Sequence, residues 1–243
     1  RVNLLVRRGD GPAWEVMDAP QLGVNGAGAR VRAIEVVGPD DIWFGGDWAG
    51  KALAMHWDGA DFTIHPTPVF GPGGSGTFGN GHATVAMSAL APDDIWAVGG
   101  AADGDPSAAS NIFHWDGATW QHVPGPTPGD DHRLFGVTAI APDDVWAVGK
   151  STPGGPFALH WDGASWSLDT LPAFVHPTGQ LDDVVAFAAD DVWACGTFLL
   201  NPAPDVARPL LMHYDGTLWT QVPSDPSGPA LGWFRGLDTL PDG

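Results

Sequence analysis

The feature that most constrains this chain is a motif that occurs four times at nearly constant spacing. Its copies are GPDDIWFGG (38–46), APDDIWAVGG (91–100), APDDVWAVGK (141–150) and AADDVWACGT (188–197). Their first aspartates stand at positions 40, 93, 143 and 190, so consecutive copies are 53, 50 and 47 residues apart. A second motif, His-Trp-Asp-Gly or His-Tyr-Asp-Gly, follows each copy and begins at residues 56, 114, 160 and 213. The chain is therefore predicted to fold as a row of similar units.

Each unit carries the signals of four short strands. The β-branched and aromatic residues of the Ile-Trp or Val-Trp segment favour a strand, and the Pro-Asp-Asp before it favours a tight turn. Asp-Gly between two strand signals predicts a hairpin tip with a type I′ turn. These tips are expected at Asp58-Gly59, Asp116-Gly117, Asp162-Gly163 and Asp215-Gly216. A unit of about 50 residues with four strands is typical of one blade of a β-propeller, whose strands we name a to d from the axis outward.

The predicted fold is thus an all-β propeller of four-stranded antiparallel blades in one domain that spans residues 1–243. Four blades are complete and a partial one stands at each end; the approximate ranges are 1–20 (partial), 31–66, 83–124, 134–172, 181–223 and 231–243 (partial). Residues 4–17 match strands c and d, and residues 234–243 match strand a. The ring is five-bladed if the two ends complete one blade. A strand c without a strand b beside it argues instead for a piece of a longer chain, with six or seven blades and further domains.

The repeat resembles that of kelch-type propellers, in which an apolar strand ends in Gly-Gly and an aromatic-Asp hairpin follows. Gly45-Gly46 and Gly99-Gly100 fit this pattern, whereas Gly149-Lys150 and Gly196-Thr197 lack the second glycine. His-Trp-Asp-Gly also replaces the usual Tyr-Asp-Pro. The chain looks most similar to the kelch-like repeats of bacterial surface proteins, which implies an extracellular or cell-surface location. Kelch-like propellers include binding scaffolds and oxidases, so the resemblance leaves the function class open.

Charge and composition narrow the function classes. A formal net charge of −19 argues against nucleic acid and anionic membrane surfaces as partners, and no apolar run approaches the roughly 18 residues of a membrane span. The single cysteine, Cys195, excludes an internal disulfide and is expected to be buried. The only tyrosine, Tyr214, lies in a hairpin motif, which argues against a copper radical oxidase that crosslinks cysteine to tyrosine. The motifs G-x-S-x-G and H-E-x-x-H are absent, so an enzyme is left open but disfavoured.

The recurrent His-x-Asp pairs resemble metal ligands when one copy is seen alone. One histidine and one aspartate from a hairpin supply only two ligands, and the next pair belongs to another blade at the outer rim. We therefore expect each histidine to form a hydrogen bond within its own blade. The four histidines are His56, His114, His160 and His213.

The residues that break the repeat are the better candidates for function. Trp48 in a b–c loop and Trp233 at the end of a d–a loop lie outside the repeat positions. Both loop classes open on the same face of a propeller, and an exposed tryptophan offers an apolar plane for a sugar ring or a partner side chain. The charged neighbours of these loops, Asp47, Arg133 and Arg235, complete the predicted ligand site.

Two histidines suggest a second candidate site on the same face. His82 and His132 occupy the same point of adjacent blades in d–a connections, with acidic residues nearby. They could hold a divalent metal or a polar ligand near the axis; otherwise the chain requires no cofactor.

These observations favour a non-enzymatic binding scaffold that recognises a glycan or a protein through the b–c and d–a loop face. One alternative is a hydrolase or lyase with an axial His/Asp site. Another is a structural module of a larger surface protein.

Overall fold

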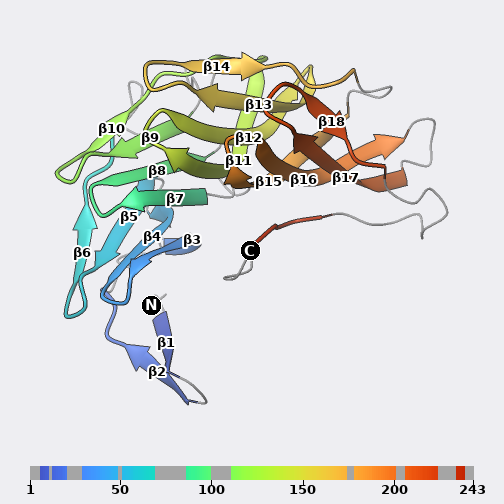
Figure 1. Cartoon of the computed structure of the whole chain (residues 1–243). Helices are drawn as coiled ribbons and strands as arrows, with labels where there is room; N and C mark the ends of the chain where they lie inside the picture. The colour runs from blue at the N-terminus through green and yellow to red at the C-terminus, as the bar shows by residue number, and fades with distance from the viewer. Residues whose placement is uncertain are drawn as a thin grey trace.

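The computed structural model describes residues 6–10, 13–20, 29–48, 51–68, 86–99, 111–173, 178–200, 206–223 and 234–238 (Figure 1). Within these ranges the chain forms 18 β-strands and no helix, so none of the described residues belongs to a helix that could cross a membrane. Four sheets have four antiparallel strands each, and a fifth is a hairpin. The all-β fold with four complete blades is thus confirmed.

The strands of each complete blade follow one another in chain order. The first two complete blades consist of β3 (Ala29–Gly38), β4 (Asp41–Trp48), β5 (Lys51–Trp57) and β6 (Phe62–His65), then β7 (Ala86–Ala91), β8 (Asp94–Gly99), β9 (Asn111–Trp115) and β10 (Trp120–His122). The next two consist of β11 (Asp131–Ala141), β12 (Asp144–Thr152), β13 (Gly155–Trp161) and β14 (Trp166–Asp169), then β15 (Gly179–Ala188), β16 (Asp191–Leu200), β17 (Val206–Tyr214) and β18 (Trp219–Gln221). Figure 1 shows these four sheets along an arc.

The two partial units occupy the positions that the repeat predicts. Strands β1 (Val6–Asp10) and β2 (Ala13–Met17) form a hairpin in which Gly9 pairs with Trp14, as expected for strands c and d. At the other end, residues 234–238 run along the fourth complete blade. The amide of Phe234 donates to the carbonyl oxygen of Gly196 at 3.4 Å, and the amide of Leu237 donates to the Asp183 carboxylate at 2.8 Å. The segment takes the place of a following strand a.

Strand b of each of the first three complete blades supplies a tryptophan that packs into the next blade. Trp43 packs with Trp115 and Trp120 of the second complete blade, and all three indoles are at least 95% buried. Trp96 packs against Trp166 in the same way, and Trp146 against Trp219. Each contact between blades is therefore a mixed cluster of aromatic and aliphatic side chains, which removes much apolar surface from water.

Strand a approaches strand b so closely at one point that only glycine fits there. A β-bulge interrupts strand a, and its extra residue is Arg32, Phe135 or Asp182 in three of the complete blades. Beside each of these bulges stands the one glycine that all four copies of the motif share, which is Gly46, Gly149 or Gly196 here and Gly99 in the remaining complete blade. A Cβ atom at Gly149 would overlap the carbonyl oxygen of Arg133, and the same holds at Gly46 and Gly196. The next residue is under no such constraint, so it differs from blade to blade.

The hairpin tips differ from the prediction. Trp57 pairs with Phe62, so the Asp-Gly turn holds four residues instead of the two of a type I′ tip. The Asp58 carboxylate accepts hydrogen bonds from the amides of Ala60 and Asp61 at 3.0 and 2.8 Å, and Gly59 has a φ of +94°. The aspartate side chain therefore takes the place of a backbone acceptor and widens the loop.

The tryptophans of strand b provide a matched pair for a stability test. Trp146→Ala removes an indole buried against the following blade and is expected to lower the free energy of unfolding by about 3–5 kcal/mol. Trp193 holds the same position in the last complete blade, but it is only half-buried. Trp193→Ala should therefore cost markedly less in chemical denaturation. Equal losses would contradict the role given to the contact between blades.

Candidate functional site

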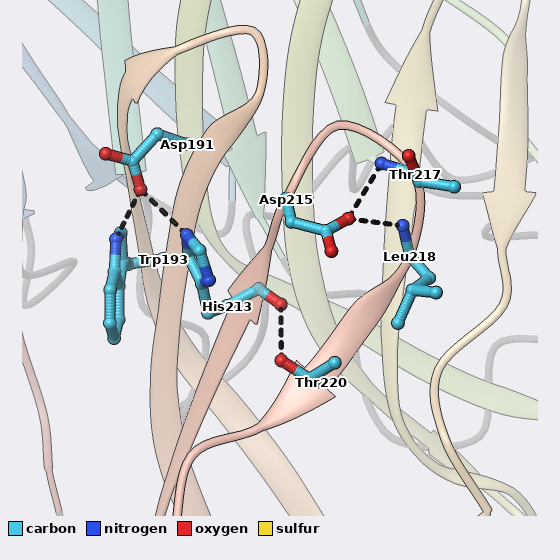
Figure 2. Close-up of polar contacts among 7 residues, drawn as sticks. All are labelled: Asp191, Trp193, His213, Asp215, Thr217, Leu218 and Thr220. Atoms are coloured by element: carbon cyan, nitrogen blue, oxygen red, sulfur yellow. Dashed lines mark hydrogen bonds and ion pairs between the residues drawn. The ribbon is translucent and has the colours of Figure 1, made fainter.

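The recurrent His-Trp-Asp-Gly motif divides its polar side chains between two structural tasks. The His213 ring pairs with Asp191 of strand b at 2.8 Å and stacks near Trp193, whereas Asp215 accepts from the amides of Thr217 and Leu218 (Figure 2). Histidine and aspartate of one motif thus have different partners. The same arrangement holds in every complete blade, with His Nε2 to Asp Oδ1 distances of 2.7–2.9 Å at His56–Asp41, His114–Asp94 and His160–Asp144. The expected hydrogen bond within each blade is confirmed.

One of the two histidines of the predicted second site, His132, lies in a strand and not in a connection. It belongs to β11 and is only 7% exposed. His82 lies outside the described residues. Among the residues that the structure describes, no group of three or more His, Cys, Asp or Glu side chains could hold a metal ion.

The axial carboxylates connect neighbouring blades. Glu35 accepts from the amide of Ala89 at 2.9 Å, and Asp183 accepts from that of Leu237 at 2.8 Å. Burial raises the pKa of both carboxyl groups, although the backbone hydrogen bonds oppose the shift. Between the second and third complete blades, the hydroxyl oxygen of Ser88 accepts a hydrogen bond from the amide of Ala139. These polar groups along the axis therefore contribute to the contacts between blades.

The b–c and d–a connections lie on one face, opposite the hairpin tips, as the antiparallel order of the strands requires. Trp48 ends strand β4 and packs, half-buried, against the cluster that contains Phe44 and Leu53, so it belongs to a strand and not to a loop as predicted. Asp47 forms an ion pair with Arg32 at 2.9 Å. Trp233 lies outside the described residues.

A pocket of about 540 Å³ opens on this face between the third and fourth complete blades. It is bounded by the β12–β13 turn, the start of β15, the end of β16 and the C-terminal segment. The residues that line it are Lys150, Ser151, Thr152, Pro153, Gly154, Gly155, Thr178, Gly179, Gln180, Thr197 and Arg235. Hydroxyl, amide and cationic groups thus reach the wall of the pocket, beside the carbon atoms of the same side chains. Of the predicted ligand residues, Arg235 lines this pocket. Arg133 does not line it, but it is the cross-strand partner of the lining residue Lys150.

Asp182 is the bulge residue of β15 and lies beside the two cations of the pocket. Its Oδ1 accepts from the Gln180 amide at 2.6 Å, whereas Oδ2 is buried and has no hydrogen-bond partner among the described residues. Burial raises the pKa of this carboxyl group, and the positive charges of Arg235 and Lys150 partly oppose the shift. Together with burial, the carboxylates of Asp183 and Asp182 raise the pKa of the Cys195 thiol to about 12, so this thiol stays protonated.

The sequence contained a signal for this pocket that was not used. Lys150 and Thr197 are the residues that replace the second glycine of the Gly-Gly pattern. Because close packing requires the glycine that precedes these two residues, a change at the next position alters the rim and leaves the blade intact. Gln180 and Asp182 had no comparable signal, since only the bulge brings them to the rim.

Comparisons with known proteins support the fold. No protein-family model and no curated protein matches the sequence. The fungal lectin of Aleuria aurantia, described as a six-bladed β-propeller with a novel fucose recognition mode, is 16% identical over 94% of this chain and 72% of its own, with a TM-score of 0.56. The chain is a β-propeller. YCF48 from Cyanidioschyzon merolae is 16% identical over 86% of this chain and 60% of its own, with a TM-score of 0.50. A structure of YCF48 bound to D1 peptide is 14% identical over 90% of this chain and 74% of its own, with a TM-score of 0.48.

Replacing two different aspartates by asparagine should change the free energy of unfolding in opposite directions. Since folding raises the pKa of Asp182, its ionised form destabilises the fold, and Asp182→Asn should raise the free energy of unfolding at pH 7. The gain should vanish below about pH 4, where the carboxyl is protonated in both states.

Asp116→Asn is the control for this experiment. Hydrogen bonds from the amides of Thr119 and Ala118 lower the pKa of Asp116, so its ionised form stabilises the fold above the unfolded-state pKa. This variant should lose stability at pH 7, and the loss should fade in acid. Denaturant titrations at pH 7 and at decreasing pH measure both differences. The loss for Asp116→Asn should fade only as the pH falls below the unfolded-state pKa of about 4 and through the lowered pKa of the folded state. The same sign for the two variants at pH 7 would refute the assignment.

Proposed function

We propose that this chain is a non-enzymatic binding protein that recognises a saccharide in the pocket between its third and fourth complete blades. The observation that carries the proposal is the pocket itself. Its volume of about 540 Å³ suits a small ligand, and it lies on the face that holds the variable connections of a rigid scaffold. A saccharide ligand agrees with the extracellular or cell-surface location that the kelch-like resemblance implies.

The lining favours a saccharide over a protein side chain. Protein partners usually insert aromatic or aliphatic anchors into apolar pockets. Among the described lining residues, the only such apolar side chain is that of Pro153, and the others offer hydroxyl, amide or charged groups and glycine backbone. These groups suit a ligand that carries many hydroxyls. The lectin of Aleuria aurantia, whose fold is similar, recognises fucose, which shows that a propeller can serve this purpose.

The proposal predicts a position-dependent loss of binding. Thr197→Trp places a large side chain in the pocket and should abolish saccharide binding on a glycan array and in calorimetry. The control is Ala164→Trp, which adds the same side chain at an exposed hairpin tip on the opposite face. Both variants should unfold at a similar denaturant concentration.

Binding that survives Thr197→Trp would place the site elsewhere on the molecule. An array on which no saccharide binds the unmodified chain would overturn the proposal and favour a protein ligand or a structural module.

A further inference from the structure

The distribution of basic residues points to the charge of the ligand. The chain has a formal net charge of −19, and only four of its ten basic residues follow Lys51. Two of these four, Lys150 and Arg235, line the pocket. An acidic protein thus places two of its few cations at one pocket.

A third basic residue strengthens the local charge. Arg133 of β11 lies directly opposite Lys150 of β12, so the two side chains share one face of the sheet. Like charges at such a position destabilise an antiparallel pair. The blade therefore places two cations side by side next to the pocket, at a position where the first and fourth complete blades have Asp47 and Thr197.

The first complete blade shows what the same rim positions do without a ligand site. There the bulge residue Arg32 and the strand-b rim residue Asp47 neutralise one another in an ion pair at 2.9 Å. Between the third and fourth complete blades the rim residues are Lys150 and Thr197, and the facing bulge residue is Asp182. Two cations, Lys150 and Arg235, lie close enough to this one carboxylate to oppose the rise of its pKa, and both line the pocket.

From these observations we propose that the pocket binds an acidic saccharide, with the anionic group of the sugar facing Lys150 and Arg235. This inference rests on the proposed saccharide-binding function. The anion is a carboxylate or a sulfate ester, since both accept hydrogen bonds from an ammonium and a guanidinium group. Gln180, Thr178 and Thr197 offer neutral partners for the sugar hydroxyls. Asp182 lies beside these two cations and offsets part of their positive charge.

The test uses an array that carries uronate, sialylated and sulfated oligosaccharides beside their neutral parents. The strongest acidic binder is then titrated against its neutral counterpart, which is the methyl ester of a carboxylate or the desulfated form of a sulfate. The acidic form should bind at least about tenfold more tightly, and its affinity should fall as salt increases.

Three variants assign this preference to the pocket. Lys150→Gln and Arg235→Gln should each weaken the acidic ligand about tenfold or more, because each removes a hydrogen bond between charged groups. Asp182→Asn should tighten its binding, since the competing negative charge is removed. Each of the three variants should change the affinity for the neutral counterpart much less than the affinity for the acidic ligand. Arg208→Gln is the matched control: it changes the net charge by the same amount, but Arg208 does not line the pocket.

The outcomes separate this inference from the proposed function. If acidic and neutral forms bind equally and Lys150→Gln has no effect, the preference for an anion is refuted, whereas a saccharide site that Thr197→Trp blocks would stand. If no saccharide of either kind binds, both proposals fail. If Arg208→Gln weakens the acidic ligand as much as Lys150→Gln, overall charge explains the preference and the assignment to the pocket is wrong.

Discussion

The packing of each strand-b tryptophan against the following blade is the contact on which the rest of the structure depends. A blade alone exposes both faces of its sheet, and only a neighbour can cover them. Trp43, Trp96 and Trp146 each bridge two blades within a cluster of buried aromatic and aliphatic residues. Behind each indole lies a histidine ring whose centroid is 4.2–4.5 Å from that of the tryptophan, and a strand-b aspartate holds this ring. The conspicuous polar motif of the chain thus supports an apolar contact.

This arrangement explains why the candidate binding site lies on the other face. The Asp–His pairs and hairpin tips occupy the end of each blade where strands b begin and strands c end. At the opposite end, the bulge in strand a and the invariant glycine of strand b fix the backbone. The residues beside them are under little packing constraint, so they differ from blade to blade. Lys150, Thr197 and Asp182 are three such residues, and all three lie at or beside the pocket.

Much of the fold could be predicted because it is repeated. Four copies of one motif gave the number of complete blades, the strand order and the hydrogen bond of each histidine, since a side chain with the same neighbours four times has a structural task. The type I′ tips were wrong because the Asp58 side chain forms local hydrogen bonds that widen the turn. Trp48 was placed in a loop, but strand β4 continues to this residue and packs it against the cluster that contains Phe44 and Leu53.

The candidate site was harder to predict, because it is formed by residues that are distant in sequence. Arg235 was selected from the loop pattern and Lys150 was noted only as a departure from Gly-Gly. Gln180 and Asp182 come to the rim through a bulge that no local pattern indicates. Residues of two blades and a C-terminal segment meet at this one pocket, so the contacts between blades create it.

The most direct test of the account is a crystal structure of the protein with its tightest acidic oligosaccharide bound. The account predicts electron density for the sugar in the pocket between the third and fourth complete blades, with its anionic group in hydrogen-bond contact with Lys150 or Arg235. Density for the sugar at another place, with this pocket empty, would contradict it.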